Sequence, residues 1–471
     1  MSNTQALQAH YHHHLAEQKT AETQALEILL GLQELNDHDV QLTLFGEALA
    51  GKSVQQLIAL HKEATHHAQT KVIELSDTLD VIHQLKQAQL TAVRADVGQL
   101  IVHGDVHTVI ANAQSGTNQA TDVVLYGFGR IGRILTRLLM SQAVSTTGLQ
   151  LKAIVVRPAP SGDLAKRASL LQRDSVHGSF VGDVKVDDVH NGIIINGRFV
   201  QVIYAKNPSE IDYTAYGIDD ALIIDNTGIW TDRAGLSEHL KAKGASKVLL
   251  TAPAKGDIKN IVYNVNTHDI GDANIVSAAS CTTNAITPTL KVLNDRYGVE
   301  TGHVETIHAF TNDQNLIDNY HKKDRRGRSA PLNMVITSTG AAKAVGKALP
   351  ELNGKLTGNA IRVPTPNVSI AILNLNLKNA PNNTEELNQY LKQIATSNLW
   401  QEQIAYSDSP EAVSTDFVGT QKVGIIDLQA TIVTDNHATV YVWYDNEMGY
   451  GTQVLRVANA MVGINHTQLP N

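Results

Sequence analysis

The single cysteine of this chain, Cys281, is the only residue among 471 that can offer a thiol. It follows a short apolar run and precedes a helical pattern that begins near Asn284, so it is expected at the N-terminus of a helix. The positive end of a helix stabilises a thiolate, and Ser280, Thr282 and Thr283 can cap backbone amides or bind an anion. A lone cysteine is more often a buried, unreactive side chain, but these polar neighbours favour a nucleophile.

A glycine-rich motif predicts a dinucleotide site. Gly127, Gly129 and Gly132 form G-x-G-x-x-G directly after the apolar run 122–126 and directly before the helical run 134–140. In this context the first glycine allows a tight turn, the second lets the backbone approach a pyrophosphate, and the third lets the helix pack on the strand. The helix N-terminus then faces the anion.

The end of the next predicted strand departs from the usual dinucleotide pattern. An acidic residue is expected there to bind the adenosine ribose, but the run 153–156 is followed by Arg157 and Pro158. The next carboxylate along the chain is Asp163. Arginine is the residue type that accepts a 2′-phosphate instead. A surface arginine beside a proline turn is the alternative, with equal weight.

Composition limits the class of protein. Because 38 Lys and Arg stand against 46 Asp and Glu, the net charge is −8, and no nucleic-acid partner is expected. One cysteine excludes intrachain disulfides and multi-cysteine metal clusters. The histidines at positions 10 and 12–14 suit a solvated helix face better than a metal tract, so no metal is expected. No apolar run reaches the roughly 20 residues of a membrane helix, and no signal peptide is evident, which predicts a cytoplasmic protein without a membrane partner.

The first 120 residues differ in amino-acid composition from the rest of the chain. All 12 prolines lie at or after Pro158, and 11 of the 20 histidines precede residue 121. An apolar stripe recurs there at helical spacing, formed by Val72, Leu75, Leu79 and Ile82. It is too short for a convincing coiled coil, so an all-helical extension with an ordinary core is predicted. After a polar linker at 113–121, apolar runs alternate with helical stretches, which is typical of βαβ units.

Seven strings occur in order between residues 126 and 450, namely YGFGRIGR, DSVHG, SCTTN, TIHAFTNDQ, TSTGAAKAV, RVPTPNVS and WYDNEMGY. Together they resemble the phosphorylating glyceraldehyde-3-phosphate dehydrogenase family, from about residue 121 to the C-terminus. The resemblance implies an α/β fold with a Rossmann-type NAD(P)-binding domain at 121–280, completed by a C-terminal helix at 447–471. It also implies an α+β catalytic domain with a mostly antiparallel sheet at 281–446, preceded by the extension at 1–120. A homotetramer is expected.

The resemblance also implies a reaction. Cys281 attacks the aldehyde of glyceraldehyde 3-phosphate, and His308 draws the thiol proton and later takes the hydroxyl proton as hydride leaves for nicotinamide. Sequence position alone cannot select this histidine, because nine lie outside the extension. Inorganic phosphate then cleaves the thioester to give 1,3-bisphosphoglycerate. The implied substrate-phosphate residues are Thr311 and Arg362, and the implied inorganic-phosphate residues are Ser280, Thr282, Thr339 and Gly340. The implied cofactor residues are Gly127, Phe128, Gly129, Arg130, Ile131, Gly132, Arg157, Thr227, Gly228, Asn446 and Tyr450.

The chain departs from the family pattern at four points, the last of which is the N-terminal extension. Arg157 replaces the ribose-binding acid, and Asn319-Tyr320 replaces a usual Leu-Pro, so NADP or dual use is favoured over strict NAD use. Tyr126 replaces the usual asparagine before the glycine motif. The extension can dock on the tetramer, alter assembly or bind a regulator. Two alternatives to the main assignment are an erythrose-4-phosphate dehydrogenase and a catalytically silent regulatory or scaffold homologue.

Overall fold

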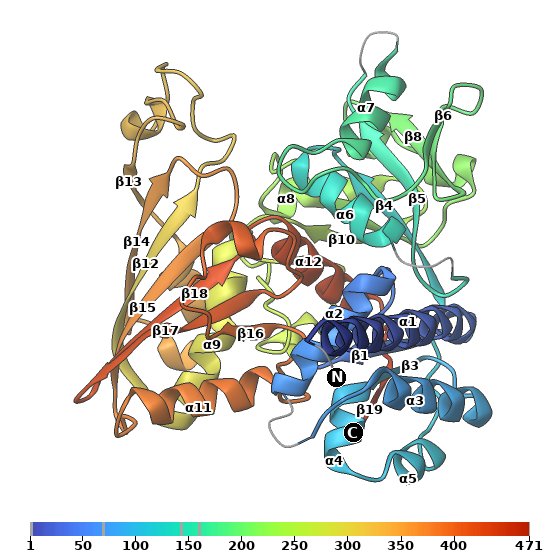
Figure 1. The fold of residues 1–471 in the computed structure, drawn as a ribbon. Coiled ribbons are helices and arrows are strands. Elements are labelled where there is room, and N and C mark those ends of the chain that lie inside the picture. Colours follow the sequence, from blue (N-terminus) through green and yellow to red (C-terminus); the bar gives the residue numbers. More distant parts are fainter. Residues whose placement is uncertain (1–2, 68–70, 142–144, 159–161, 471) are drawn as a thin grey trace. The chain divides into compact units, whose positions relative to one another are not determined.

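A computed structural model of the protein describes residues 3–67, 71–141, 145–158 and 162–470 (Figure 1). The chain forms two compact units. The first unit comprises Met1–Gln119, Gln142–Gly148 and Ile464–Asn471, and the second comprises Ala120–Ser141 and Leu149–Gly463. Every site residue expected from the sequence therefore belongs to the second unit.

The first unit combines helices with a four-stranded sheet in the order β19-β3-β1-β2. Its elements are α1 (Asn3–Asn36), β1 (Val40–Leu44), β2 (Glu47–Ala48), α2 (Val54–His67), α3 (Leu75–Ala88), β3 (Val93–Asp96), α4 (Val97–His103), α5 (Val106–Ala111) and β19 (Thr467–Leu469). Strand β3 pairs in parallel with both β1 and β19, whereas β2 is antiparallel to β1. The extension is thus mainly helical but not all-helical, which corrects the expectation from the sequence.

Local and distant features together explain this difference. Helix α3 begins at Leu75, where the Asp77 carboxylate accepts a hydrogen bond of 2.8 Å from the Glu74 N–H. Val72 therefore lies outside the helix and is exposed, so only part of the apolar stripe forms one buried face. The strands are short, and β19 comes from the C-terminus. No local pattern in the first 120 residues could reveal a sheet that is completed by so distant a segment.

Leu469 places the C-terminal strand in the core of the first unit, where it is 3% exposed. We expect Leu469→Ala to lower the free energy of unfolding of this unit by about 2–5 kcal/mol, because the change removes buried methyl groups and leaves a cavity. Hydrogen exchange of the amides of β1 and β3 measures the effect. Gln468→Ala, on the exposed side of the same strand, is the control and should change it by less than about 0.5 kcal/mol. Equal losses in both variants would contradict the prediction.

The second unit holds an eight-stranded sheet in the order β11-β10-β9-β4-β5-β8-β7-β6. Its strands are β4 (Ala120–Tyr126), β5 (Gly148–Val156), β6 (Val184–Asp187), β7 (Gly192–Ile195), β8 (Arg198–Tyr204), β9 (Ala221–Asp225), β10 (Ala245–Leu250) and β11 (Ile275–Ser277). The pairs from β11 to β4 and the pair β5–β8 are parallel, and β6, β7 and β8 are antiparallel. This arrangement is the expected Rossmann-type sheet.

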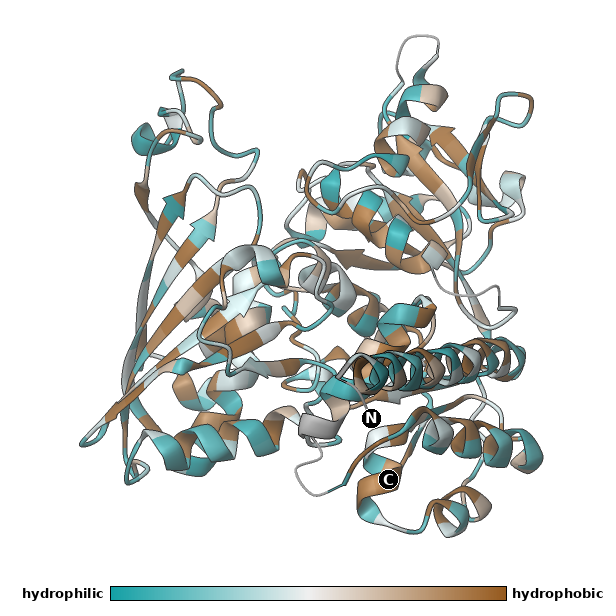
Figure 2. Cartoon of the chain, viewed as in Figure 1, coloured by the Kyte–Doolittle hydropathy of each residue, from teal (hydrophilic) through white to brown (hydrophobic). Residues whose placement is uncertain are grey.

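Helices cover this sheet. They are α6 (Arg130–Ser141), α7 (Asp163–Gln172), α8 (Arg233–Leu236) and α12 (Met448–Met461). Leu135 of α6, Ile154 of β5 and Val454 of α12 share one hydrophobic core, so the C-terminal helix packs with the Rossmann-type elements. Figure 2 shows hydrophobic residues concentrated along the strands of this sheet.

A second, seven-stranded sheet follows in the order β13-β14-β12-β15-β18-β17-β16. Its strands are β12 (Val299–Ala309), β13 (Val335–Ser338), β14 (Leu356–Val363), β15 (Ser369–Leu377), β16 (Ile404–Ser407), β17 (Gly424–Thr434) and β18 (His437–Tyr444), and its helices are α9 (Cys281–Tyr297), α10 (Ala341–Ala348) and α11 (Thr384–Ala395). Only β12–β14 and β16–β17 are parallel pairs, so the sheet is mostly antiparallel as expected. Strand β15 alternates buried and half-buried residues, which fits a sheet with helices on one face.

Candidate active site

Cys281 is the first residue of α9, directly after its N-cap residue Ser280. The Ser280 hydroxyl accepts a hydrogen bond of 3.1 Å from the Thr283 N–H. This N-cap hydrogen bond fixes the residue at which the helix begins. Ala279 has a φ of 55°, a strained value for a residue with a side chain. The sharp turn after β11 thus presents the partly buried thiol at the helix start, as its neighbours predicted.

His308 lies near the end of β12, and its Nε2 is 3.6 Å from the Cys281 Sγ. Its Nδ1 is 2.7 Å from the Ala309 carbonyl oxygen. The two side chains come from a helix and a strand that are separated by 27 residues in sequence. The structure therefore brings together Cys281 and His308, the pair that the resemblance implied.

Burial shifts both members of this pair toward their neutral forms. Burial raises the pKa of the Cys281 thiol, although the positive charge of Arg362 opposes this shift. Burial, together with the positive charge of Arg362, lowers the pKa of His308 to about 3. The expected thiolate at the helix N-terminus is thus outweighed by the loss of solvating water. At neutral pH, the structure holds a thiol beside a neutral imidazole.

Arg362 controls the hydrogen bonding of His308. It pairs with His308 in the register of β14 and β12, and its Nη1 lies 2.8 Å from His308 Nδ1 and 2.9 Å from the Ala309 carbonyl oxygen. A guanidinium only donates hydrogen bonds, so Nδ1 either accepts from Arg362 or donates to Ala309. Only the second tautomer leaves the Nε2 lone pair free to face the thiol.

Tyr444, at the end of β18, is a buried neighbour of this pair that the sequence analysis did not single out. Its hydroxyl lies 2.9 Å from the Thr282 Oγ1 and 2.7 Å from the Thr306 Oγ1. Its ring packs edge-on against the His308 ring. Tyr444 precedes Asp445 in the WYDNEMGY string, which was the available signal. The hydroxyl ties α9 to β12, the two elements that carry the thiol and the imidazole.

The residues expected to bind phosphates fall into two groups. Ser280 and Thr282 flank the thiol, and Thr311 follows the end of β12. Thr339 and Gly340 lie on a separate turn at the start of α10, where the Thr339 Oγ1 accepts a hydrogen bond of 3.2 Å from the Ala341 N–H. Helix α10 packs against α9 and β14, the elements that carry Cys281 and Arg362. No direct hydrogen bond joins this turn to Cys281 or His308 within the described part of the chain.

The glycine motif forms the predicted strand-turn-helix. Gly127 has a φ of 100°, and a side chain on Gly132 would lie 2.4 Å from the Gly127 carbonyl oxygen, so both positions require glycine. The space that a side chain on Gly129 would occupy is open. Phe128 is buried, and Arg130 and Ile131 begin α6. This open cradle at a helix N-terminus fits a dinucleotide pyrophosphate.

A second turn adjoins the glycine motif. Thr227 donates hydrogen bonds of 2.7 Å to Asp225 Oδ1 from both its backbone N–H and its hydroxyl. Its methyl group limits the space beside Gly127, and Gly228 follows with a φ of 65°. Asp225 in turn lies 3.0 Å from the fully buried His239. The structure thus places Thr227 and Gly228 beside the glycine turn, and Asp225 is an anchor that the sequence analysis missed.

Arg157 follows the end of β5 and is exposed. Asp163, the next carboxylate, forms an ion pair with Arg167 and accepts a hydrogen bond of 3.2 Å from the Tyr204 hydroxyl. Tyr126 is buried and packs its ring 4.7 Å from the ring of His239. The departure at Tyr126 therefore has a packing role, and Asp163 already has partners of its own.

The two remaining residues expected at the cofactor, Asn446 and Tyr450, come from the C-terminal part of the chain. The Asn446 Oδ1 accepts a hydrogen bond of 3.1 Å from the Ser369 hydroxyl, which in turn accepts one of 3.0 Å from the Ala309 N–H. The Tyr450 hydroxyl donates a hydrogen bond of 3.0 Å to the Ala279 carbonyl. Asn446 is thus connected to the residue after His308, and Tyr450 to the residue two positions before Cys281. Ser369, in the RVPTPNVS string, had not been singled out.

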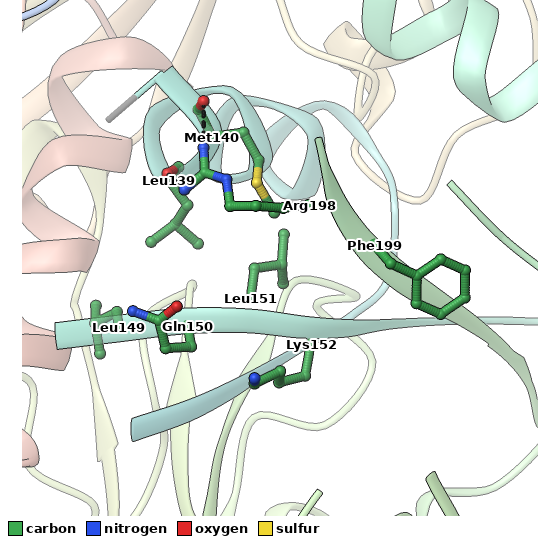
Figure 3. A pocket seen from close by; sticks show the side chains of 8 residues that line it. All are labelled: Leu139, Met140, Leu149, Gln150, Leu151, Lys152, Arg198 and Phe199. Carbon is green, nitrogen blue, oxygen red and sulfur yellow. Dashed lines mark hydrogen bonds between the residues drawn. The ribbon is translucent and has the colours of Figure 1, made fainter. Parts of the chain in front are cut away.

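A separate cavity of about 200 Å³ lies between the end of α6, the start of β5 and β8 (Figure 3). The Arg198 side chain reaches across it and donates to the Met140 carbonyl oxygen at 2.5 Å. Its lining residues are Leu139, Met140, Leu149, Gln150, Leu151, Lys152, Arg198 and Phe199. None of the expected site residues lines this cavity.

Two further features concern the described residues as a whole. His14 lies 3.2 Å from His10 and 3.0 Å from Glu17 on the exposed side of α1, yet no group of three or more His, Cys, Asp or Glu side chains there is arranged to hold a metal ion. Among those same residues, no helix has the length and apolar character needed to cross a membrane.

Comparisons with known proteins agree with this geometry. A family model described as the glyceraldehyde 3-phosphate dehydrogenase NAD binding domain matches residues 121–233, and one described as the C-terminal domain matches residues 280–446. A glyceraldehyde-3-phosphate dehydrogenase-like protein of Pseudomonas aeruginosa (strain UCBPP-PA14) is 50% identical over 93% of this chain and 98% of its own length. Glyceraldehyde-3-phosphate dehydrogenase 1 of Bacillus subtilis (strain 168) is 40% identical over 72% of this chain and 97% of its own length. The chloroplastic GAPB enzyme of Arabidopsis thaliana is 40% identical over 72% of this chain and 74% of its own length. The Pseudomonas match reaches into the first 119 residues, because it covers 93% of the chain.

Proposed function

The chain belongs to the glyceraldehyde-3-phosphate dehydrogenase family, and we propose that it catalyses the reversible phosphorylating oxidation of glyceraldehyde 3-phosphate with a nicotinamide dinucleotide. The observation that carries this proposal is the distance of 3.6 Å between the Cys281 Sγ and the His308 Nε2, beside the anchored Asn446. A thiol and an imidazole at this distance can exchange a proton. The family membership makes a dinucleotide the electron acceptor.

His308 moves protons at its Nε2 in this reaction. It takes the Cys281 proton as Sγ bonds to the aldehyde carbon, and it returns that proton to the carbonyl oxygen to give a thiohemiacetal. It then takes the hydroxyl proton while the carbon loses hydride, leaving a thioester on Cys281. When bound, the nicotinamide supplies the hydride acceptor. Inorganic phosphate attacks the thioester carbon, the C–S bond breaks, and Cys281 leaves as a thiolate that is reprotonated.

Two sets of residues bind the anions in this proposal. Thr311 and Arg362 hold the substrate phosphate, and Ser280, Thr282, Thr339 and Gly340 receive the attacking phosphate. Arg362 lies 2.8 Å from His308 Nδ1, so a phosphate that pairs with the guanidinium offsets its positive charge near the imidazole. Nδ1–H can then donate to the Ala309 carbonyl, and Nε2 becomes a better base. Substrate binding thereby prepares the proton acceptor.

The dinucleotide lies across the glycine turn in this proposal. Phe128 to Ile131 approach the pyrophosphate, Thr227 and Gly228 approach the adenosine, and Asn446 holds the nicotinamide carboxamide with Tyr450 nearby. We propose that the enzyme uses NADP, or both NAD and NADP, because Arg157 is exposed at the strand end where a ribose-binding acid is usual. Asp163 is already paired with Arg167 and does not supply that acid.

Arg157→Ala tests this preference. We expect kcat/KM with NADP to fall about tenfold, since a charge-assisted contact to the 2′-phosphate is lost, while kcat/KM with NAD changes less than about twofold. Steady-state rates with each dinucleotide give the ratio of kcat/KM with NADP to kcat/KM with NAD. Arg173→Ala, which removes another exposed arginine of the same domain, is the control and should leave the ratio unchanged. If Arg157→Ala has the same ratio of kcat/KM with NADP to kcat/KM with NAD as the unmodified enzyme, Arg157 does not bind the 2′-phosphate and is an ordinary surface residue.

An exposed hydrophobic segment supports an oligomer. Leu316, Ile317, Tyr320, Leu332 and Met334 are exposed large apolar side chains within residues 316–334. Clustered exposure of this kind marks a protein interface. We propose that this segment, which includes the unusual Asn319-Tyr320 pair, is covered in a homotetramer.

The function itself is tested by turnover of the purified protein. Rates with glyceraldehyde 3-phosphate and phosphate are measured with NAD and with NADP, and Cys281→Ser serves as the blank. Turnover that requires both phosphate and Cys281 is the expected result. Equal or better use of erythrose 4-phosphate would assign the four-carbon substrate instead. Dinucleotide binding without turnover of either aldehyde would favour a silent homologue.

A further inference from the structure

Charged residues from two of the sequence strings meet in a buried cluster. Asp174 and His177 come from the DSVHG string, and Asp445 and Glu447 come from the WYDNEMGY string. Arg130, the first residue of α6, joins them. The ion pairs within this group connect the Rossmann-type part of the second unit with the segment on either side of Asn446.

His177 is bordered by three carboxylates, and the Asn367 side-chain amide lies 3.2 Å from its Nε2. Its side chain is 2% exposed, and its Nε2 lies 3.1 Å from an oxygen of the fully buried Asp445 carboxylate. Its Nδ1 lies 3.6 Å from both the Asp174 and the Glu447 carboxylates. Although Nδ1 is buried, it forms no hydrogen bond among the described residues. An imidazolium, which carries a hydrogen on both nitrogens, fits a site with carboxylates on both sides better than a neutral ring does.

The same carboxylates hold Arg130. Its guanidinium donates to Asp174 at 3.1 Å and also pairs with Glu447. With His177 protonated, three carboxylates face two cations, so deprotonation leaves a larger excess of negative charge beside Arg130. The charged groups around His177 are Asp174, Asp445, Glu447 and Arg130, with Arg133 and Arg137 as the next charges beyond Asp174.

This cluster is joined directly to the proposed cofactor residues. Arg130 lies on the glycine turn that is proposed to face the pyrophosphate. Asp445 accepts hydrogen bonds from the N–H groups of Glu447 at 2.9 Å, Met448 at 2.8 Å and Gly419 at 2.8 Å, so it fixes the backbone around Asn446. One layer of carboxylates therefore connects His177 to the residues proposed at the pyrophosphate and to the segment proposed at the nicotinamide.

We propose that His177, as an imidazolium, is a positioning residue that balances these carboxylates and thereby holds the glycine turn and the Asn446 segment in the geometry that binds dinucleotide. The inference rests on the proposed function, because it requires a dinucleotide at this site. Burial by itself would lower the pKa of His177, but the neighbouring carboxylates outweigh it and the pKa is raised. The protonated form of His177 therefore persists to a higher pH than that of an unperturbed histidine.

The sign of the effect follows from this charge balance. As pH rises through the raised pKa of His177, its proton is lost and the cluster beside the pyrophosphate site becomes more negative. A dinucleotide is an anion, so its dissociation constant is expected to rise, by about tenfold if binding shifts the pKa by about one unit. At pH values below that range the affinity stays high.

Dinucleotide titrations of the full-length protein, followed by tryptophan fluorescence between pH 6 and 9.5, test the inference. His177→Gln can still donate to Asp445 but cannot be protonated. We expect its dissociation constant to be independent of pH and close to the high-pH value of the unmodified protein. His190→Gln changes an exposed histidine of the same domain and serves as the control, with the unmodified pH curve expected. Any titration of the ligand itself is common to all variants.

A second variant keeps the test decisive if His177→Gln fails to fold. Asp445→Asn removes the negative partner at Nε2, so the rise in the dissociation constant should move to lower pH. An unmodified pH curve in either variant, or a uniform loss of affinity without a change in pH dependence, would overturn the inference. Turnover is measured separately. A protein with the expected pH-dependent binding but no aldehyde oxidation would refute the proposed function and not the role of His177, and a protein that binds neither dinucleotide would refute both.

Discussion

Replacement of Cys281 by serine is expected to lower kcat for glyceraldehyde 3-phosphate oxidation by at least about 10³-fold. A serine hydroxyl is a far weaker acid than a thiol, and His308, whose pKa is lowered to about 3, cannot draw its proton effectively. An oxygen ester would also be a poorer acyl donor to phosphate than the thioester. The loss therefore falls on the chemical steps and not on binding.

The measurement is steady-state turnover at saturating substrate, together with dinucleotide affinity by fluorescence. Affinity is expected to remain within about twofold of the unmodified protein, because Cys281→Ser changes one atom at a partly buried position. A variant that keeps a tenth or more of the original kcat would show that Cys281 is not the nucleophile. Reduced dinucleotide affinity of the same size as the loss in kcat would point instead to a structural defect.

Replacement of His308 by asparagine is expected to lower kcat by about 10²–10⁴-fold, the range that positioned acid–base groups supply. His308 Nε2, at 3.6 Å from the Cys281 Sγ, is the proton acceptor in the proposed reaction. Without His308, attack depends on the small fraction of Cys281 that is already ionised at the pH of the assay. Burial raises the pKa of the Cys281 thiol, so this thiolate is scarce at neutral pH.

The pH profile gives this prediction a distinct signature. In the variant, kcat/KM should rise about tenfold for each pH unit below the raised thiol pKa, because the thiolate fraction rises in that proportion. The unmodified enzyme should show a shallower rise, since His308 accepts the proton during attack. His303→Asn, in the same strand β12 but bound to Thr357 and Asn359, is the matched control with unmodified activity expected. Parallel pH profiles for His308→Asn and the unmodified enzyme would exclude His308 as the base.

The extension shows where sequence patterns stop being informative. The stripe from Leu75 to Ile82 predicted a helix correctly, because its spacing and the Asp77 contact to Glu74 are local. The sheet beside it was missed, since β1 and β3 are short and β19 joins them from the C-terminus. The structure makes the extension and the last residues one compact unit, so both ends of the chain contribute to its fold.

The charge cluster around His177 illustrates the same limit within the second unit. DSVHG and WYDNEMGY each contain carboxylates, but neither string shows that Asp174 and Glu447 share Arg130. Ser369 likewise connects Asn446 with Ala309, the residue after His308. Tyr444 contacts Thr282 at the start of α9. Such contacts depend on sheet order, which a linear pattern does not contain.

The sequence by itself determined the local chemistry of this protein: a thiol at a helix start behind the Ser280 cap, and a glycine turn between β4 and α6. These features depend on residues a few positions apart, whose conformational and hydrogen-bonding preferences act within a single turn. Apart from the family resemblance, only the tertiary structure decided which of the nine histidines outside the extension faces Cys281. It alone decided that burial favours the neutral forms of this pair and that three carboxylates border His177. Those properties arise from the packing of strands and helices distant in sequence, which sets both the distances between charges and their access to water.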